Sequence, residues 1–407
     1  MTLETQPPPP TKSLAHELED GPLRRELGLP PAPPPPSPLP TAHVQHLVFS
    51  GRGSEYFRIW VVGALLTLLT FGIYSAWAKV RKARWFAQHT LLDGDRFDYH
   101  GDPLRVLAGR VVALLLLLLW SWGFEFSLWL GMAVLALFCV CGPLLFASAQ
   151  RFRLANTSWR GLRFGFEVPR AKVYAVCVPL LLLWAAGSVA QSAGVEGALF
   201  VAAGLVPLLG LPWAHARLKQ LQHGHASFGD QRFGLQPSTP EFYGLYAKAL
   251  VLLIVGGVMV GLAAAAVAAV RTSRLNVGGW SDESMLWPLL AATGSVLLLW
   301  MMAWPYFAAR LQQIVWGRTR CGALWFSGEM RGAHLWRLVL VNTALVLVTA
   351  GLYWPFAAVA IARYRVQSIA VHSDMRLAEV QAGAAPRGEQ RSAGDGAADF
   401  FGLDLGW

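Results

Sequence analysis

Eight segments of mostly apolar residues, each about long enough to cross a bilayer, dominate this sequence of 407 residues. A membrane-spanning helix needs about 20 such residues in a row. Charged residues make up only 14% of the chain, which is too few to cover the surface of a soluble protein of this size. We therefore predict an all-α polytopic membrane protein of about eight transmembrane helices. The predicted spans are residues 57–76, 104–120, 126–147, 173–190, 196–213, 249–270, 286–308 and 337–356.

Lysine and arginine are distributed very unevenly among the segments that connect these spans. Four long connectors hold 21 of them, whereas the shorter turns between the spans hold two. Such a bias places the four connectors in the cytoplasm. With one span outside the first and last connectors, both termini are expected on the other side of the membrane, unless 57–76 or 337–356 is re-entrant. The connectors are residues 77–105, 148–172, 214–248 and 309–337.

The two ends of the chain differ in composition from the rest. Residues 1–45 contain 13 of the 25 prolines and cannot bury a core, which is typical of a disordered or polyproline segment. Residues 376–407 are rich in alanine, glycine and charge, and we expect them to be disordered as well. The sequence therefore predicts a single transmembrane domain over 46–375 between two disordered tails.

A short motif recurs after several spans and indicates internal repeats. An aromatic residue is followed four positions later by a cation or an amide, and 15 to 17 positions later by a glycine. We interpret each copy as a helix at the membrane surface, a glycine turn with positive φ and a short strand. Strands of different connectors are expected to pair into a small cytoplasmic sheet, because a lone strand is unstable. The copies are WAKVR (77–81), FASAQ (146–150), WAHAR (213–217) and YFAAR (306–310), with a degenerate FAAVA (356–360) that lacks the glycine.

The conserved spacing of these copies suggests which side chains meet the membrane surface. A cation one turn beyond an interfacial aromatic ring can extend to phosphate headgroups. We predict that the following cations face lipid headgroups or other anions: Lys79, Arg81, Arg84, Arg151, Arg153, Arg217 and Arg310. The predicted turn glycines are Gly94, Gly161, Gly229 and Gly322, and a phenylalanine follows each of them, at Phe97, Phe164, Phe233 and Phe326.

Three stretches resemble a known family of bacterial membrane proteins. They read FSGRGSEYFR (49–58), TFGIYSAWAKVRK (70–82) and LDGDRFDYHGD (92–102). They are similar to the YjgN-type inner-membrane family, a domain of unknown function, and the resemblance extends over about 45–375. It implies a multi-pass protein of the bacterial cytoplasmic membrane. It implies no activity, because none is assigned to the family.

The sequence contains no pattern that favours an enzyme. We find no nucleophile and base at catalytic spacing, and the pair His223 and His225 has no neighbouring cysteine to complete a metal site. We expect no metal and no cofactor, and we expect the bilayer and its anionic headgroups, not nucleic acid, as partners. Two functions remain open. One is transport or lipid handling through the helical bundle, and the other is a structural or scaffold role in which the basic connectors bind anionic lipid or a protein.

Overall fold

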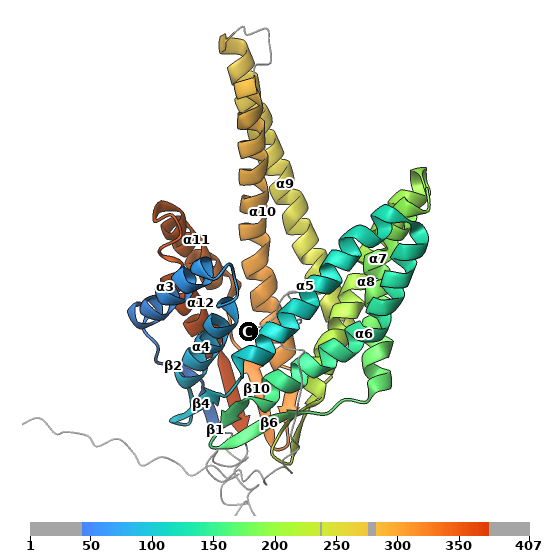
Figure 1. Ribbon diagram of the computed structural model, residues 1–407. Coiled ribbons are helices and arrows are strands. Elements are labelled where there is room, and N and C mark those ends of the chain that lie inside the picture. Colours follow the sequence, from blue (N-terminus) through green and yellow to red (C-terminus); the bar gives the residue numbers. More distant parts are fainter. Residues whose placement is uncertain (1–42, 237, 276–281, 374–407) are drawn as a thin grey trace, which may run out of the picture. The chain divides into compact units, whose positions relative to one another are not determined.

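The computed structural model describes residues 43–236, 238–275 and 282–373 (Figure 1). Within these residues there are ten helices and eleven strands. The predicted helix-rich membrane chain is confirmed, but the all-α class is too narrow, because the connectors form a large antiparallel sheet. The predicted tails fall almost wholly outside the described residues.

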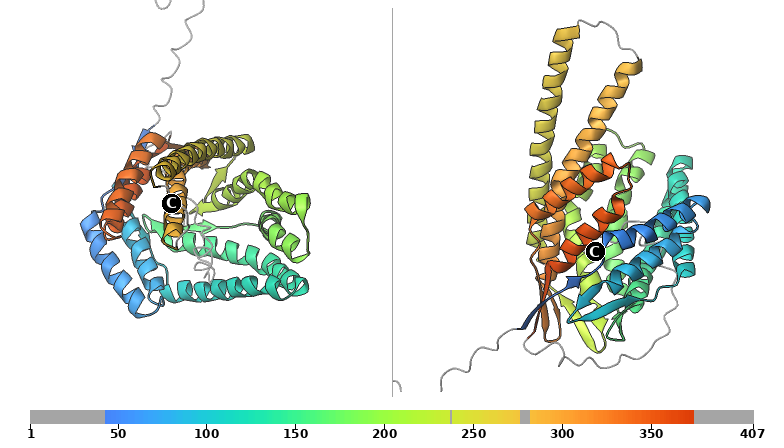
Figure 2. Two further views of the ribbon diagram at one scale, coloured as in Figure 1. Left: turned by 90° about the horizontal axis from the view of Figure 1, so that it is seen from above. Right: turned by 90° about the vertical axis from the view of Figure 1, so that its left-hand side faces the viewer.

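The helices form five pairs of consecutive helices. Each helix contacts the next one along the chain, and α12 also contacts α3, so that the pairs follow one another around a ring (Figure 2). The pairs are α3 (Gly53–Leu69) with α4 (Ser75–Gln88), α5 (Pro103–Phe126) with α6 (Leu128–Ala155), α7 (Arg170–Ser192) with α8 (Gly197–Gly224), α9 (Thr239–Leu275) with α10 (Asp282–Trp316), and α11 (Gly332–Val348) with α12 (Trp354–Gln367).

Five helices in the described part are long and apolar enough to cross a membrane, and the predicted number of eight is not confirmed. They are α5, α6, α7, α8 and the Thr239–Leu262 part of α9. The helices α3 and α11 have only 17 residues each. The predicted spans 57–76 and 337–356 do not form single helices, because the backbone reverses within each of them.

The same turn interrupts both of these segments. Gly72 and Gly351 each have a φ of 92°, and each donates its backbone N–H to a carbonyl five residues earlier. Thr70 and Thr349 then accept the backbone N–H of the residue four positions on, at 2.9 and 3.0 Å. These polar turns join two short helices that run back towards the sheet. The alternative of two re-entrant segments therefore agrees with the structure better than two complete spans.

The connectors between helix pairs fold into β-hairpins, each of which pairs with the next hairpin in antiparallel fashion. The predicted pairing between connectors is confirmed. The strand before each glycine turn is only three residues long and was not predicted. The hairpins are β3 (Thr90–Leu92) with β4 (Asp95–Tyr99), β5 (Thr157–Trp159) with β6 (Leu162–Phe166), β7 (Ala226–Phe228) with β8 (Gln231–Leu235), and β9 (Thr319–Cys321) with β10 (Leu324–Gly328).

The two ends of the described chain close this sheet into a ring. The strand β1 (His43–His46) pairs with β11 (Ile369–Ser373), while β2 (Val48–Phe49) pairs with β3, and only Leu47 separates β1 from β2. Leu47 itself donates its N–H to the carbonyl of Ile369 at 3.2 Å. A closed sheet leaves no edge open to other chains. Both described ends thus lie in the same sheet as the connectors, and the expectation that they lie across the membrane from them is wrong.

Aromatic side chains pack inside the closed sheet. The four predicted phenylalanines each lie six residues before the next helix, and their neighbouring ring centroids are 6.3, 6.4 and 6.1 Å apart. Leu47 holds the corresponding position before α3 and packs in the same cluster as the buried Trp159 and Val371. Such contacts contribute both apolar burial and ring–ring attraction. The fifth copy lacks its own glycine and phenylalanine because the N-terminal strand completes its hairpin.

Candidate functional site

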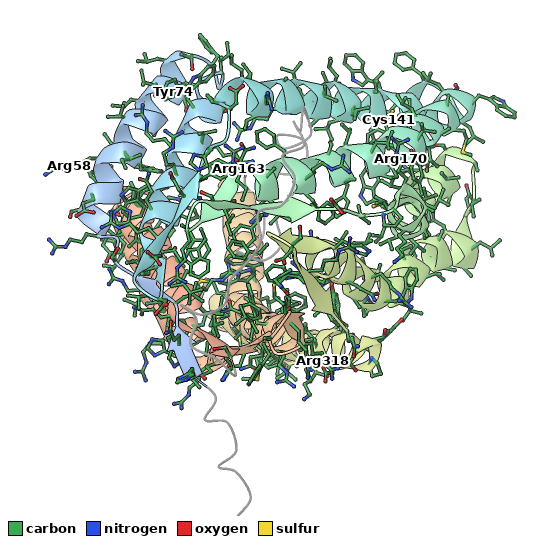
Figure 3. All side chains as sticks on the ribbon, turned by 90° about the horizontal axis from the view of Figure 1, so that it is seen from below. Arg58, Tyr74, Cys141, Arg163, Arg170 and Arg318 are labelled. Carbon is green, nitrogen blue, oxygen red and sulfur yellow. The ribbon has the colours of Figure 1, made fainter. Side chains whose placement is uncertain are left out.

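The seven predicted anion-facing cations all lie where the second helix of a pair approaches the sheet. Each is between four and eleven residues before the following strand, and Arg81, Arg217 and Arg310 are each nine residues before it. These three side chains are exposed. We call the set the basic rim; it consists of Lys79, Arg81, Arg84, Arg151, Arg153, Arg217 and Arg310. Seen from the sheet side, further cations from other elements, including Arg163, Arg170 and Arg318, lie around the same ring (Figure 3).

Two of the sequence alignments within the motif are shifted by two residues. Trp77, Trp213 and Tyr306 lie 13 residues before a strand, whereas Phe146 lies 11 residues before one. The position that corresponds to the aromatic in the second copy is therefore Leu144. In the same way, the resemblance of residues 49–51 to 326–328 is out of register, since Leu47 and not Phe49 corresponds to Phe326.

The four predicted turn glycines lie in the hairpin turns. Gly94, Gly161, Gly229 and Gly322 have φ values of 81°, 76°, 59° and 57°, in the left-handed region. In the first two hairpins the preceding residue also has a positive φ, as a type I′ turn requires. In the last two the glycine is the first residue of the turn, which explains why its spacing from the aromatic residue is shorter by one.

Between neighbouring hairpins the chain forms a recurring polar contact region. Here the loop that leads into the first helix of a pair lies beside the residue that precedes the next hairpin. We call each such place a junction and name it by the helix that the loop enters. There are five junctions in the described chain, at α3, α5, α7, α9 and α11.

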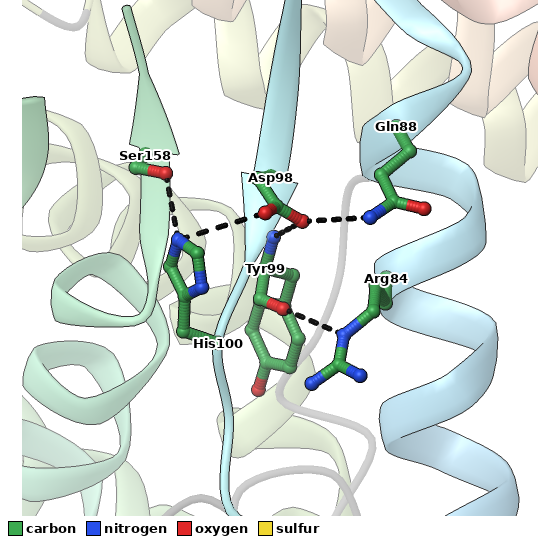
Figure 4. A network of polar contacts seen from close by, with 6 residues as sticks. All are labelled: Arg84, Gln88, Asp98, Tyr99, His100 and Ser158. Carbon is green, nitrogen blue, oxygen red and sulfur yellow. Dashed lines mark hydrogen bonds and ion pairs between the residues drawn. The ribbon is translucent and has the colours of Figure 1, made fainter. Parts of the chain in front are cut away.

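The α5 junction is held together by polar groups of the chain itself (Figure 4). Arg84 Nε donates to the carbonyl of Tyr99 at 3.1 Å, and Gln88 donates to the Asp98 carboxylate at 3.1 Å. His100 Nε2 lies 3.8 Å from the other Asp98 oxygen. The predicted role of Arg84 in anion binding is therefore combined with a structural one, because part of its guanidinium supports the loop before α5.

The α7 junction instead contains a basic pocket of 550 Å³. Its lining includes the cations Arg151, Lys172 and Arg232, together with Glu167 and His225. Glu167 lies 3.9 Å from Arg232, and both of these side chains are more than 80% exposed. Burial, and secondly the charge of Lys172, hold the pKa of His225 below its usual value. His225 is therefore neutral at pH 7, and the pocket has three positive charges and one negative charge.

The backbone around this pocket is fixed by the pairing of β6 with β7. Glu167 donates its N–H to the carbonyl of His225 at 3.1 Å, which extends the ladder by one bond beyond Phe166. Gly165 faces Ser227 across the two strands, and a Cβ at Gly165 would lie 2.5 Å from the Ser227 hydroxyl. A glycine is needed there for the two strands to approach. This approach carries the N-terminus of α7 to the side of His225.

Of the residues that line this pocket, the sequence predicted only Arg151. Lys172 begins a predicted span, and Arg232 lies in an extended segment with no cation nearby in sequence. Arg151 and Arg232 come from the connectors on either side of the α7–α8 pair, so no local pattern joins them. The signal that could have found them is the pairing of β6 with β7.

Comparison with known proteins identifies the family. The model of a family of bacterial proteins of unknown function, DUF898, matches residues 44–400. The chain belongs to the DUF898 family. The inner membrane protein YjgN of Salmonella typhimurium is 28% identical over 213 residues, which are 48% of this chain and 53% of that protein. YjgN of Escherichia coli K12 is 30% identical over 142 residues, or 34% of this chain and 35% of its own length.

The aligned part thus spans about half or less of the length of these DUF898 relatives. No solved structure is significantly similar to the chain. The family and its relatives, together with five helices able to span a membrane, confirm the predicted location. The chain is a multi-pass protein of the bacterial inner membrane.

Proposed function

We propose that this inner-membrane protein binds anionic phospholipids. Their headgroups contact the basic rim and the α7 junction, and their acyl chains lie against the apolar helices. The proposal includes an architecture of five related helix-pair units, which the recurring order of helices and strands supports. It is a binding function, so it requires no nucleophile and no cofactor.

The helices expose an unusual amount of apolar surface. In the most apolar stretch of each of the five candidate spans, only 11 to 33% of the residues are buried within the protein. Trp129 and Leu209, for example, are 85% and 71% exposed. In a bilayer such side chains contact acyl chains, because lipid is the only apolar partner left for them. The spans therefore offer lipid access to much of their surface.

A polar and an apolar pocket lie on the same helix pair at a separation that suits a phospholipid. The apolar pocket, of 370 Å³, lies between α7 and α8 and is lined by Leu182, Ala186, Ala203 and neighbouring residues. Leu182 is ten residues beyond Lys172, or about 15 Å along a helix. Half of a bilayer core is also about 15 Å thick. A headgroup at the α7 junction would place the apolar pocket near the bilayer midplane.

This arrangement favours lipid binding over passage of a solute through the sheet. The interior of the sheet is packed with Phe97, Phe164, Phe228, Trp159 and further apolar side chains. The observation that carries the proposal is the basic pocket at the sheet-side end of an apolar, lipid-accessible helix pair.

Lipid that co-purifies with the protein provides the test. The protein is extracted from bacterial membranes in a mild detergent, and its bound phospholipids are compared with those of the whole membrane. We expect enrichment of phosphatidylglycerol and cardiolipin over phosphatidylethanolamine. Replacing the exposed Arg81, Arg217 and Arg310 together by glutamine is expected to lower this enrichment. Bound lipid with the same composition as the membrane would contradict the proposal.

A further inference from the structure

The five junctions can be compared position by position, because the backbone is the same in most of them. In four of them a residue of the loop before the helix donates its N–H to the carbonyl of the residue that precedes the next strand, at 2.7 to 3.1 Å. The side chains at corresponding positions therefore occupy corresponding places. The bonded pairs are Ser50 with His89, His100 with Asn156, Glu167 with His225, and Glu329 with Ser368.

Two junctions contain a built-in pair of opposite charge. The third residue of α3 is Glu55, and its carboxylate lies 3.6 Å from Nε2 of His89, which precedes β3. The third residue of α9 is Glu241, which accepts two hydrogen bonds, at 3.0 and 2.6 Å, from Arg318, which precedes β9. At both junctions the chain itself supplies a carboxylate between the helix and the neighbouring hairpin.

At the α7 junction the same two positions hold Lys172 and His225. Neither side chain forms an ion pair with any described residue, although both line the basic pocket. The carboxylate that two other junctions contain is here replaced by a cation. The α5 junction also has a cation at the helix position, Arg105, but Asp102 lies 3.6 Å from it.

A third position points to the same junction. The residue six positions before each strand is a polar side chain at the end of a helix, and in three junctions it donates a hydrogen bond to a carbonyl of the loop. Arg151 holds this position at the α7 junction and lines the pocket, yet it makes no hydrogen bond or ion pair with the described residues. The three bonds are from Arg84 to Tyr99, from Gln313 to Met330 and from Arg363 to Gly51, at 3.1, 2.7 and 2.8 Å.

We infer that the α7 junction is a phosphate-binding site, occupied by the phosphate of an anionic phospholipid headgroup. Arg151, Lys172 and Arg232 come from three different elements and surround a 550 Å³ pocket whose side chains leave a net positive charge. The planar guanidinium group suits phosphate oxygens, and the N-terminus of α7 adds the positive end of a helix dipole. The inference rests on the proposed function and names its headgroup site.

Two substitutions test the site with residues that the other junctions already contain. Lys172→Glu introduces the glutamate found at α3 and α9, and Arg151→Gln introduces the glutamine that Gln313 represents at α11. Both variants are therefore expected to fold. Arg105→Glu makes the same change of charge at the corresponding place in α5 and serves as the matched control.

Each protein is placed in phosphatidylcholine nanodiscs containing a minor fraction of phosphatidylglycerol, and bound lipid is counted by native mass spectrometry. We expect one tightly held phosphatidylglycerol in the wild type and in Arg105→Glu. Both α7-junction variants are expected to bind it about tenfold more weakly or worse, since each loses a charge-assisted bond. Inorganic phosphate, titrated by calorimetry into phosphatidylcholine nanodiscs, forms the second arm.

The outcomes separate the site from the broader function. Loss of one bound lipid in both folded variants supports the inference. Binding of inorganic phosphate without a preference for phosphatidylglycerol would keep a phosphate site but contradict its occupation by lipid. Anionic lipid enriched equally in the wild type and both variants would overturn the site while leaving the proposed function standing. If neither probe binds the wild type, both are wrong.

Discussion

Closure of the sheet by the N-terminal strand can be tested by truncation. Removing residues 2–47 deletes β1 and Leu47 and opens the ring between β11 and β2, whereas removing residues 2–42 leaves all described strands in place. The comparison of the two truncations isolates five residues. It also keeps the undescribed N-terminal segment out of the difference.

The expected loss follows from the bonds at this seam. Four residue pairs join β1 to β11, and Leu47 adds one more bond to Ile369. An antiparallel ladder of four pairs contains about four hydrogen bonds, each with a net contribution of about 0.5–1.5 kcal/mol, which gives about 2–6 kcal/mol in all. Ala370 and Val371, now 0% and 2% exposed, would lose their cover as well.

The assay is thermal unfolding in detergent, followed by intrinsic tryptophan fluorescence. We expect the 2–42 truncation to melt like the full chain and the 2–47 truncation to melt at least about 4 °C lower. As an independent check, Val44→Cys with His372→Cys should form a disulfide in membranes, because these two residues face each other across the ladder. Equal melting of the two truncations, with no cross-link, would refute a closed sheet.

Three further predictions concern single side chains. Gly94→Val should destabilise the protein by about 1 kcal/mol or more, because φ is 81° and a Cβ there meets no neighbouring atom, so that only backbone strain acts; Gly94→Asn should cost less, and equal chemical denaturation curves would contradict the turn. Binding of phosphatidylglycerol vesicles should strengthen as pH falls below about 6.5, since protonation of His225, whose pKa is lowered in the folded state, adds a positive charge beside Lys172. His225→Gln should flatten this dependence down to the range where Glu167 is protonated, and an unchanged profile would argue against it. Glu241→Gln removes the partner of Arg318, but both side chains are more than a third exposed, so the melting experiment should show a loss below about 1 kcal/mol.

Local patterns in the sequence were enough to find most of the helices and the basic rim. Apolar runs such as 128–147 read directly as helix, and pairs such as Asp93–Gly94 mark tight turns. The same runs misled at 57–76, because hydropathy alone does not see that Phe71 and Gly72 have positive φ and reverse the chain. A helix of 17 residues and the turn after it have the composition of a span.

The closed sheet was out of reach of the sequence for a different reason. Its first strands, such as Thr90–Leu92, are too short to show a period of two. Its closing pair joins residues 43–46 to residues 370–373, more than 300 positions away. Such pairing is decided by tertiary packing around the aromatic interior, and the sequence signal for it is a single missing glycine in the last copy of the motif.

The candidate site was found only in part for a related reason. Arg151 belongs to a local motif, but Lys172 and Arg232 contribute to the pocket only because β6 pairs with β7. What singles out the α7 junction is a difference from the other junctions, the lysine in place of Glu55 and Glu241. Recognising it requires the correct register, which the two-residue shift at Phe146 had obscured.

A structure of the protein in nanodiscs that contain phosphatidylglycerol would test the central claim most directly. The account predicts density for a phosphate within hydrogen-bond distance of Arg151 and Lys172. It predicts none at the α9 junction, where Arg318 already binds Glu241. A lipid-saturated structure in which the α7 junction holds only water, or is closed by a carboxylate of the chain itself, would contradict the account.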